Sequence, residues 1–252
     1  WLYAQKRKNK FVLISKNAKI SFATIRREKM IGFYNISVIL TYVGLMSSLF
    51  GMANLVLAPA GDPVSLKIAF LCLVFSGFCD MFDGKIARMV KRTQQEKEFG
   101  IQIDSLCDLI CFGVYPAFIV VTMSHMHWIS MIAGGLFVLG GVIRLGYFNV
   151  MEHERQQQTT ENRKYFQGLP ITSSAIVFPF IFAVESVVNA VETKIPFKVP
   201  NLNLIYTIIM FLVAILFVWD IKVKKPGTKE VVFLASIGLL IIIGIVVGKP
   251  AV

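Results

Sequence analysis

Four aspartates lie close together in a chain that is otherwise mostly apolar: Asp80, Asp83, Asp104 and Asp108. Apolar sequence long enough to cross a bilayer precedes the first pair and follows the second. A lone carboxylate at the bilayer centre costs roughly 2.5–3.5 kcal/mol on insertion scales unless a positive group balances it. Because Mg²⁺ and Mn²⁺ prefer oxygen ligands, the four residues predict a site for two divalent ions that together hold a diphosphate.

The spacing of these residues predicts two helix faces. Residues three or four apart lie on the same side of a helix, and the first such face carries Asp80, Asp83, Gly84, Ala87 and Arg88. The second face carries Gly100, Asp104 and Asp108, each four residues apart. The small residues leave room beside the carboxylates for a bulky ligand or for close helix packing. Two acidic helix faces are therefore expected to meet at one site.

The composition predicts the elements that position these faces. Of 252 residues, 56% are hydrophobic and 16% are charged, which indicates an all-α, polytopic membrane helical bundle of about six to eight spans. The predicted helices are 34–57, 65–90, 100–123, 128–149, 171–191, 204–219 and 231–247. Pro116 is expected to kink the third of them. Cys72, Cys79, Cys107 and Cys111 are expected to be buried, inert thiols.

The net charge of +11 is concentrated in particular segments. Residues 1–30 are basic and are expected to form an interfacial helix or a flexible tail. The loops at 91–98, 151–166 and 220–230 carry most of the remaining Lys and Arg, whereas the turns on the other side carry few. The positive-inside rule then predicts a cytoplasmic N-terminus and a cytoplasm-facing site. Basic loops beside anionic lipid account for the charge, so no nucleic-acid partner is predicted.

Residues 80–88, DMFDGKIAR, followed by Gly100, Asp104 and Asp108, resemble the signature of the CDP-alcohol phosphotransferase family. That signature is D-x2-D-G-x2-A-R, a spacer, and G-x3-D-x3-D, and every fixed position matches. The spacer at 89–99 is longer than the family's and is expected to lengthen the connecting loop. Residues 144–150, RLGYFNV, and 165–170, YFQGLP, resemble the branch that uses CDP-diacylglycerol and serine. The resemblance covers about residues 32–180, and the last two helices match only in hydropathy.

The resemblance implies an enzyme that transfers the phosphatidyl group of CDP-diacylglycerol to the hydroxyl of L-serine, with CMP as the second product. It implies two Mg²⁺ or Mn²⁺ ions on Asp80, Asp83, Asp104 and Asp108, with Asp108 also the general base for the hydroxyl. The residues expected around CDP are Asp83, Gly84, Ala87, Arg88 and Gly100. The expected organisation is a catalytic core at 31–191 and C-terminal helices at 192–252 that complete the bundle. A homodimer in the cell membrane is also implied.

The acceptor site is predicted from charge. The serine carboxylate requires a cation near the metals, and Arg144 is the candidate; the alternative is an arginine that snorkels to the interface. Asn149, Tyr165 and Gln167 are expected to bind the amino group or to cap helices, while Gly168 and Pro170 are expected to shape a turn. Two other functions remain open: transfer to another alcohol, such as glycerol 3-phosphate or an inositol phosphate, and transport of cations by the carboxylates.

Overall fold

The computed structural model describes residues 31–59, 61–90, 92–158, 165–191, 202–224 and 227–250. The prediction for the basic segment 1–30 therefore lies outside the described residues. The chain divides into two units, Trp1–Tyr34 and Asn35–Val252, and all the elements described below belong to the second.

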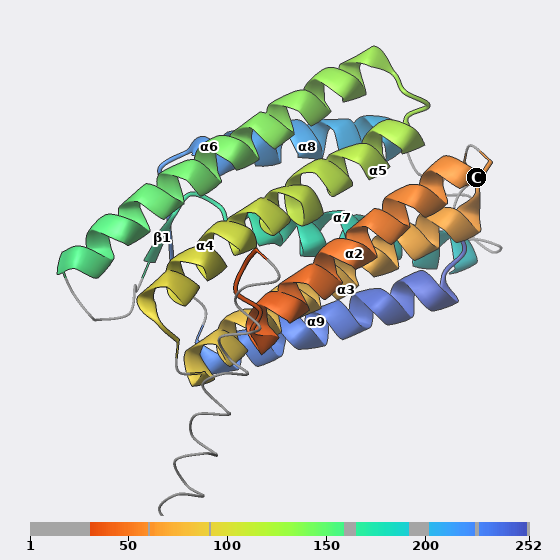
Figure 1. Ribbon diagram of the computed structural model, residues 1–252. Helices are drawn as coiled ribbons and strands as arrows, with labels where there is room; N and C mark the ends of the chain where they lie inside the picture. The colour runs from red at the N-terminus through yellow and green to blue at the C-terminus, as the bar shows by residue number, and fades with distance from the viewer. Residues whose placement is uncertain are drawn as a thin grey trace, which may run out of the picture. The chain divides into compact units, whose positions relative to one another are not determined.

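The second unit is a helical bundle with one short pair of strands (Figure 1). In chain order its elements are α2 (Ile36–Leu57), α3 (Pro63–Met89), α4 (Gln94–Asp108), the π-helix η1 (Leu109–Val114), α5 (Tyr115–Met123), α6 (Trp128–Gln158), β1 (Tyr165–Gln167), the 3-10 helix η2 (Ile171–Ser173), α7 (Ser174–Val191), α8 (Leu202–Val218), β2 (Lys222–Lys224) and α9 (Thr228–Val247). Among the described residues, six helical segments are long and apolar enough to span a membrane, with Gln94–Met123 counted as one of them. The shorter α8 is also apolar. The predicted class, an all-α polytopic membrane protein, is confirmed.

Two predicted helix boundaries are wrong, and both helices are longer than expected. The second acidic helix begins at Gln94 rather than residue 100, because Thr93 and Glu96 form a capping box. The fourth predicted helix continues to Gln158 rather than ending at residue 149. Residues 150–158 contain no Gly or Pro, and Glu152 and Arg155 form an ion pair one turn apart at 2.6 Å. The charged segments expected to be loops are thus partly helix extensions beyond the apolar spans.

The helix expected to kink at Pro116 contains a π-helical turn directly before this proline. The backbone N–H of Tyr115 donates to the carbonyl oxygen of Ile110, five residues earlier, and Pro116 has no N–H to donate. The carbonyl oxygen of Phe112 in this turn accepts a hydrogen bond of 2.8 Å from the hydroxyl of Ser174 at the start of α7. The irregular turn is therefore tied to a neighbouring helix immediately beyond Asp108.

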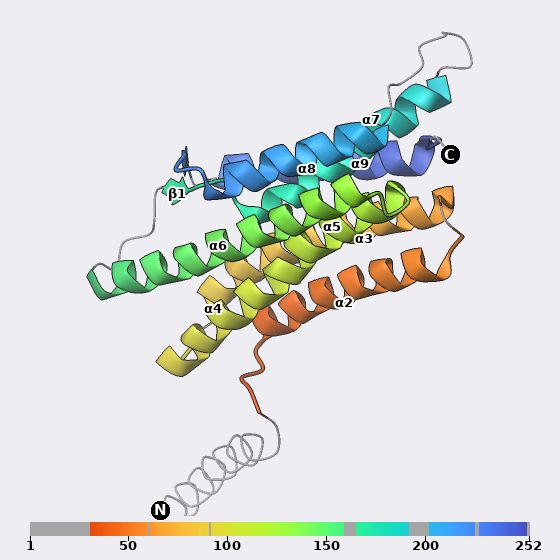
Figure 2. The same ribbon diagram turned by 90° about the horizontal axis from the view of Figure 1, so that it is seen from above.

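Helix α2 packs antiparallel against α3, while α8 lies along α6, and α9 lies along α3 and α7 (Figure 2). Buried aromatic rings fill the interior, including a stacked pair, Phe70 and Phe182, whose centroids are 4.4 Å apart. Small residues allow close approach elsewhere. A side chain at Gly51 would overlap the hydroxyl of Tyr115, which donates to the carbonyl oxygen of Ala69. Aromatic rings and close helix contacts thus fill the interior of the bundle, away from the end that carries the aspartates.

Two short strands pair two segments that are far apart in the sequence, one between α6 and α7 and the other between α8 and α9. β1 pairs with β2 in antiparallel register, with Tyr165 opposite Lys224 and Gln167 opposite Lys222. The chain then turns at Gly168, which has a φ of +73° and lies so close to the carbonyl oxygen of Phe217 that a Cβ would be 2.6 Å away. The strands lie at the same end of the bundle as the aspartate-bearing helix ends, opposite the turns that join α2 to α3 and α5 to α6 (Figure 1). This sheet was not predicted from the sequence.

Candidate active site

Two helices bring three of the four aspartates together. Asp80 and Asp83 lie near the end of α3, and Asp104 lies in α4. One carboxylate oxygen from each of these residues lies within 4.8 Å of the others. The Asp83 side chain is buried, while Asp80 and Asp104 are half-buried. The two acidic faces expected from the spacing therefore meet.

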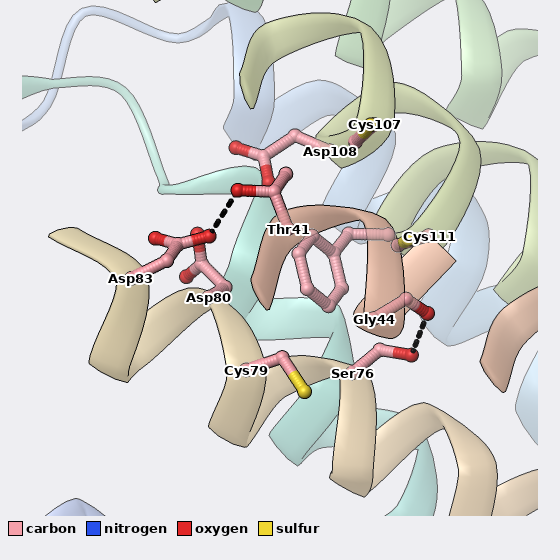
Figure 3. A pocket seen from close by; sticks show the side chains of 10 residues that line it. Thr41, Gly44, Ser76, Cys79, Asp80, Asp83, Cys107, Asp108 and Cys111 are labelled. Carbon is pink, nitrogen blue, oxygen red and sulfur yellow. Dashed lines mark hydrogen bonds between the residues drawn. The ribbon is translucent and has the colours of Figure 1, made fainter. Parts of the chain in front are cut away.

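Asp108, the last residue of α4, lines the same pocket as Asp80 and Asp83 (Figure 3). The pocket lies between α2, α3 and the α4–η1 segment and holds about 200 Å³ of space, part of it open solvent. Its lining residues are Thr41, Gly44, Ser76, Cys79, Asp80, Asp83, Cys107, Asp108, Cys111 and Phe112. Asp108 does not belong to the group of three convergent carboxylates, so it occupies a distinct position at the edge of that group.

Arg144 is a cation that acts on these carboxylates from another helix. It lies in α6, and its charge interacts with those of both Asp80 and Asp108. Its side chain is only 8% exposed, and the guanidinium carbon lies 5.2 Å from the centre of the Phe148 ring. The Arg144 side chain is thus buried, whereas a snorkelling arginine would be exposed, and its role in acceptor binding stays a prediction.

Asn149 makes a contact that was not predicted, and its proposed binding of the amino group stays a prediction. Its side-chain amide and the hydroxyl of Ser105 exchange hydrogen bonds of 3.0 and 3.1 Å. Ser105 directly follows Asp104 in α4. Asn149 therefore joins α6 to the helix that carries the second acidic face, and it does not cap a helix, because α6 continues past it.

The other predicted site residues lie in α3, α4 and β1. Gly84 and Ala87 are half-buried and follow Asp83 in α3, and a Cβ at Gly100 would lie 3.3 Å from an Arg92 nitrogen. Gln167 ends β1 and pairs with Lys222. The side chains of Arg88 and Tyr165 lie outside the described part of the structure.

The contribution of α2 was not predicted from the sequence. The hydroxyl of Thr41 donates a hydrogen bond of 2.6 Å to Oδ2 of Asp83, and Gly44 lines the pocket one turn deeper (Figure 3). A signal is nevertheless present, because Thr41, Gly44 and Ser48 form a stripe of small and polar residues in an apolar helix. Three of the cysteines also line the pocket, and all four are free thiols.

Comparison with known proteins gives a family match over most of the chain. Residues 34–246 match the family model described as CDP-alcohol phosphatidyltransferase. The match includes α8 and α9, which the motif resemblance did not reach. Together with the signature residues on α3 and α4, it covers the whole described bundle from α2 to the last turn of α9.

Among similar proteins, the CDP-diacylglycerol--serine O-phosphatidyltransferase of Saccharomyces cerevisiae is 29% identical over 164 residues, which are 63% of this chain and 58% of the relative. A protein of the same name from Methanocaldococcus jannaschii is 26% identical over 217 residues, or 86% of this chain and 89% of the relative. The archaetidylserine synthase of Methanothermobacter thermautotrophicus is 35% identical over 113 residues, or 44% of this chain and 45% of the relative. The chain thus spans less than two thirds of the yeast relative.

Proposed function

Because the chain belongs to the CDP-alcohol phosphatidyltransferase family, we propose that it is a phosphatidylserine synthase, which transfers the phosphatidyl group of CDP-diacylglycerol to L-serine. The products are phosphatidylserine and CMP. The names of relatives from yeast, archaea and bacteria support this acceptor, since each contains serine. The single observation that carries the proposal is the convergence of three carboxylates from α3 and α4 beside Arg144.

The carboxylate group fits a divalent cation. Oxygen ligands about 2.1 Å from an ion such as Mg²⁺ lie no more than about 4.2 Å from one another, close to the 4.8 Å that bounds the three aspartates. Small side-chain rotations are enough to close that difference. Asp80, Asp83 and Asp104 would hold one metal ion, and Asp108 would contribute to a second. Bound Mg²⁺ or Mn²⁺ would neutralise the diphosphate and stabilise the leaving CMP.

The side chains of the protein bind the CDP moiety and accept the proton that the reaction releases. Gly84, Ala87, Arg88 and Gly100 form the expected surface for the CDP moiety, with the guanidinium suited to a phosphate. The bond from serine oxygen to phosphorus forms while the bond from phosphorus to the CMP oxygen breaks. Asp108 accepts the proton of the serine hydroxyl. The acyl chains stay in the lipid between helices.

Arg144 provides the acceptor specificity in this proposal. A buried guanidinium can bind a carboxylate through two parallel hydrogen bonds, and serine brings one carboxylate. One guanidinium balances the single carboxylate of serine, whereas a phosphorylated acceptor carries more negative charge and would be poorly balanced by Arg144 alone. This observation favours serine over glycerol 3-phosphate or an inositol phosphate.

The proposed location is a membrane with the site facing the cytoplasm. The described residues between helices at the aspartate end include Arg92 and Lys222, whereas the turns at the opposite end, 58–62 and 124–127, contain no Lys or Arg. The positive-inside rule therefore supports a cytoplasmic aspartate end. A homodimer is proposed from the family resemblance.

Release of CMP tests the function. Purified protein is incubated with CDP-diacylglycerol, Mn²⁺ or Mg²⁺, and in turn serine, glycerol 3-phosphate or inositol phosphate. CMP and phosphatidylserine are expected with serine only. CMP release with glycerol 3-phosphate and none with serine would contradict the acceptor assignment. Cation flux into liposomes without CMP release under any condition would instead favour the transporter alternative.

A further inference from the structure

Helix α2 contributes one polar side chain directly to the aspartate group. The hydroxyl of Thr41 donates to Oδ2 of Asp83 at 2.6 Å, and Asp83 is only 4% exposed (Figure 3). This distance falls in the range of hydrogen bonds from a hydroxyl to an ionised carboxylate, which are about twice as strong as neutral ones. The orientation of Asp83 therefore depends on a residue far from it in the sequence.

Thr41 has a choice of acceptor. A threonine inside a helix commonly donates to the carbonyl four residues earlier, and the carbonyl oxygen of Ser37 lies 3.1 Å from the Thr41 hydroxyl. A hydroxyl has only one proton to donate. Because the contact with Asp83 is shorter and the carboxylate is the stronger acceptor, the proton goes to Asp83.

The register of α2 against α3 places Thr41 opposite Asp83. One and two turns deeper, Ser76 donates to the carbonyl oxygen of Gly44 at 2.8 Å, and the hydroxyls of Ser48 and Ser76 lie 2.9 Å apart. A Cβ at Gly44 would lie 3.2 Å from Cβ of Cys79, so the two helices are close at this level. A side chain as short as threonine reaches the carboxylate only because of this approach.

We propose that Thr41 is a positioning residue for divalent metal binding by Asp83. Its hydroxyl fixes the Asp83 carboxylate beside those of Asp80 and Asp104, so that the three oxygens are arranged before the ion enters. Groups that orient metal ligands in this way typically change metal affinity by about 10–100-fold when they are removed. The inference rests on the proposed function in one respect, namely that these aspartates hold the metal.

The test compares Thr41→Val, which removes the hydroxyl but keeps the shape, with Thr41→Ser, which keeps the hydroxyl. The full chain in detergent is titrated with Mn²⁺ alone, and free Mn²⁺ is measured by electron paramagnetic resonance. Ser48→Ala is the matched control, since it removes another hydroxyl between α2 and α3 that does not line the pocket. Thr41→Val is expected to weaken Mn²⁺ binding by about 10-fold or more, and Thr41→Ser by less than about threefold.

Ser48→Ala is expected to lower the melting temperature while its Mn²⁺ affinity stays at the level of the unsubstituted chain. Unchanged binding in Thr41→Val would overturn the inference, and so would a loss in Thr41→Ser or Ser48→Ala as large as that in Thr41→Val. An unsubstituted chain that binds no Mn²⁺ would overturn it as well. Since no substrate is present, failure of CMP release with serine would contradict the proposed function separately.

Discussion

The side-chain amide of Asn149 in α6 and the hydroxyl of Ser105 in α4 form hydrogen bonds with each other. Ser105 directly follows Asp104. The contact links the helix of the candidate acceptor residue Arg144 to the helix of the second acidic face. Asn149 is thus placed to hold α4 in position, in addition to any contact that it makes with an acceptor.

A double-mutant cycle separates these two roles of Asn149. If Asn149 acts through Ser105, then Asn149→Ala, Ser105→Ala and the double variant should each lower kcat by a similar factor, about 2–10-fold for one hydrogen bond of about 0.5–1.5 kcal/mol. The measurement is CMP release at varied serine concentration. A rise in the KM for serine that appears in Asn149→Ala and not in Ser105→Ala would instead assign the amide to acceptor binding.

Arg144→Gln is expected to impair use of serine specifically. A charged hydrogen-bonding partner contributes about 1.5–3 kcal/mol, so kcat/KM for serine should fall about 10–150-fold, mainly through KM. The reason is that the acceptor carboxylate would lose its partner in a buried site. CDP-diacylglycerol binding should stay within a few-fold.

Arg155→Gln is the matched control for Arg144→Gln. Arg155 lies on the same helix, three turns further on, and pairs with Glu152 in a half-buried surface position. Its substitution should leave the KM for serine unchanged. Equal effects of the two substitutions would show that α6 tolerates neither loss, and the acceptor role of Arg144 would then be unsupported.

Gly168→Ala is expected to destabilise the protein. The left-handed backbone at this position costs a residue with a Cβ roughly 1–2 kcal/mol, and the added atom would also meet the carbonyl oxygen of Phe217. The melting temperature in detergent should fall by several degrees. Gly146→Ala in α6 is the control, because apart from its chain neighbours and its own helix backbone no atom lies within 4 Å of the position that its Cβ would occupy, and alanine favours a helix.

The parts of this fold that depend on local sequence could be predicted, and those that depend on distant contacts could not. The apolar spans and the two acidic faces follow from composition and helical period. The pairing of Gln167 with Lys222 and the bond from Thr41 to Asp83 depend on how separate helices come into register, which no local pattern specifies. The early start of α4 is a different case, because the capping box of Thr93 and Glu96 is a local signal that the prediction of a charged loop at 91–98 overlooked.

The candidate site shows the same division. The residues of the signature were found by spacing, since a helix places positions three and four apart on one face. Thr41 was not, because its importance arises only when α2 lies against α3 at the level of Asp83. Ser174 was missed for a similar reason, since the carbonyl oxygen that it binds becomes available only in the π-helical turn after Asp108.

Asp108→Asn is expected to abolish turnover while CDP-diacylglycerol binding is largely kept. The amide has nearly the shape of the carboxylate but cannot accept the serine proton, and general-base catalysis typically contributes about 10²–10⁴-fold. Binding should survive because Asp108 lies beside, and not within, the group formed by Asp80, Asp83 and Asp104. The measurements are CMP release with serine and equilibrium binding of CDP-diacylglycerol in the presence of Mn²⁺.

Asp104→Asn provides the contrast for Asp108→Asn, because it removes one of the three convergent carboxylates and should weaken binding of both metal and CDP-diacylglycerol. If Asp108→Asn instead lost donor binding to the same extent, its main role would be that of a metal ligand and the base would have to be sought elsewhere. A variant that binds the donor tightly, turns over at most about 1% of the normal rate and retains its melting temperature would support proton transfer at this carboxylate. The position of Asp108, at the end of α4 directly before the π-helical turn, would then be the feature that sets the base apart from the three carboxylates of the first metal ion.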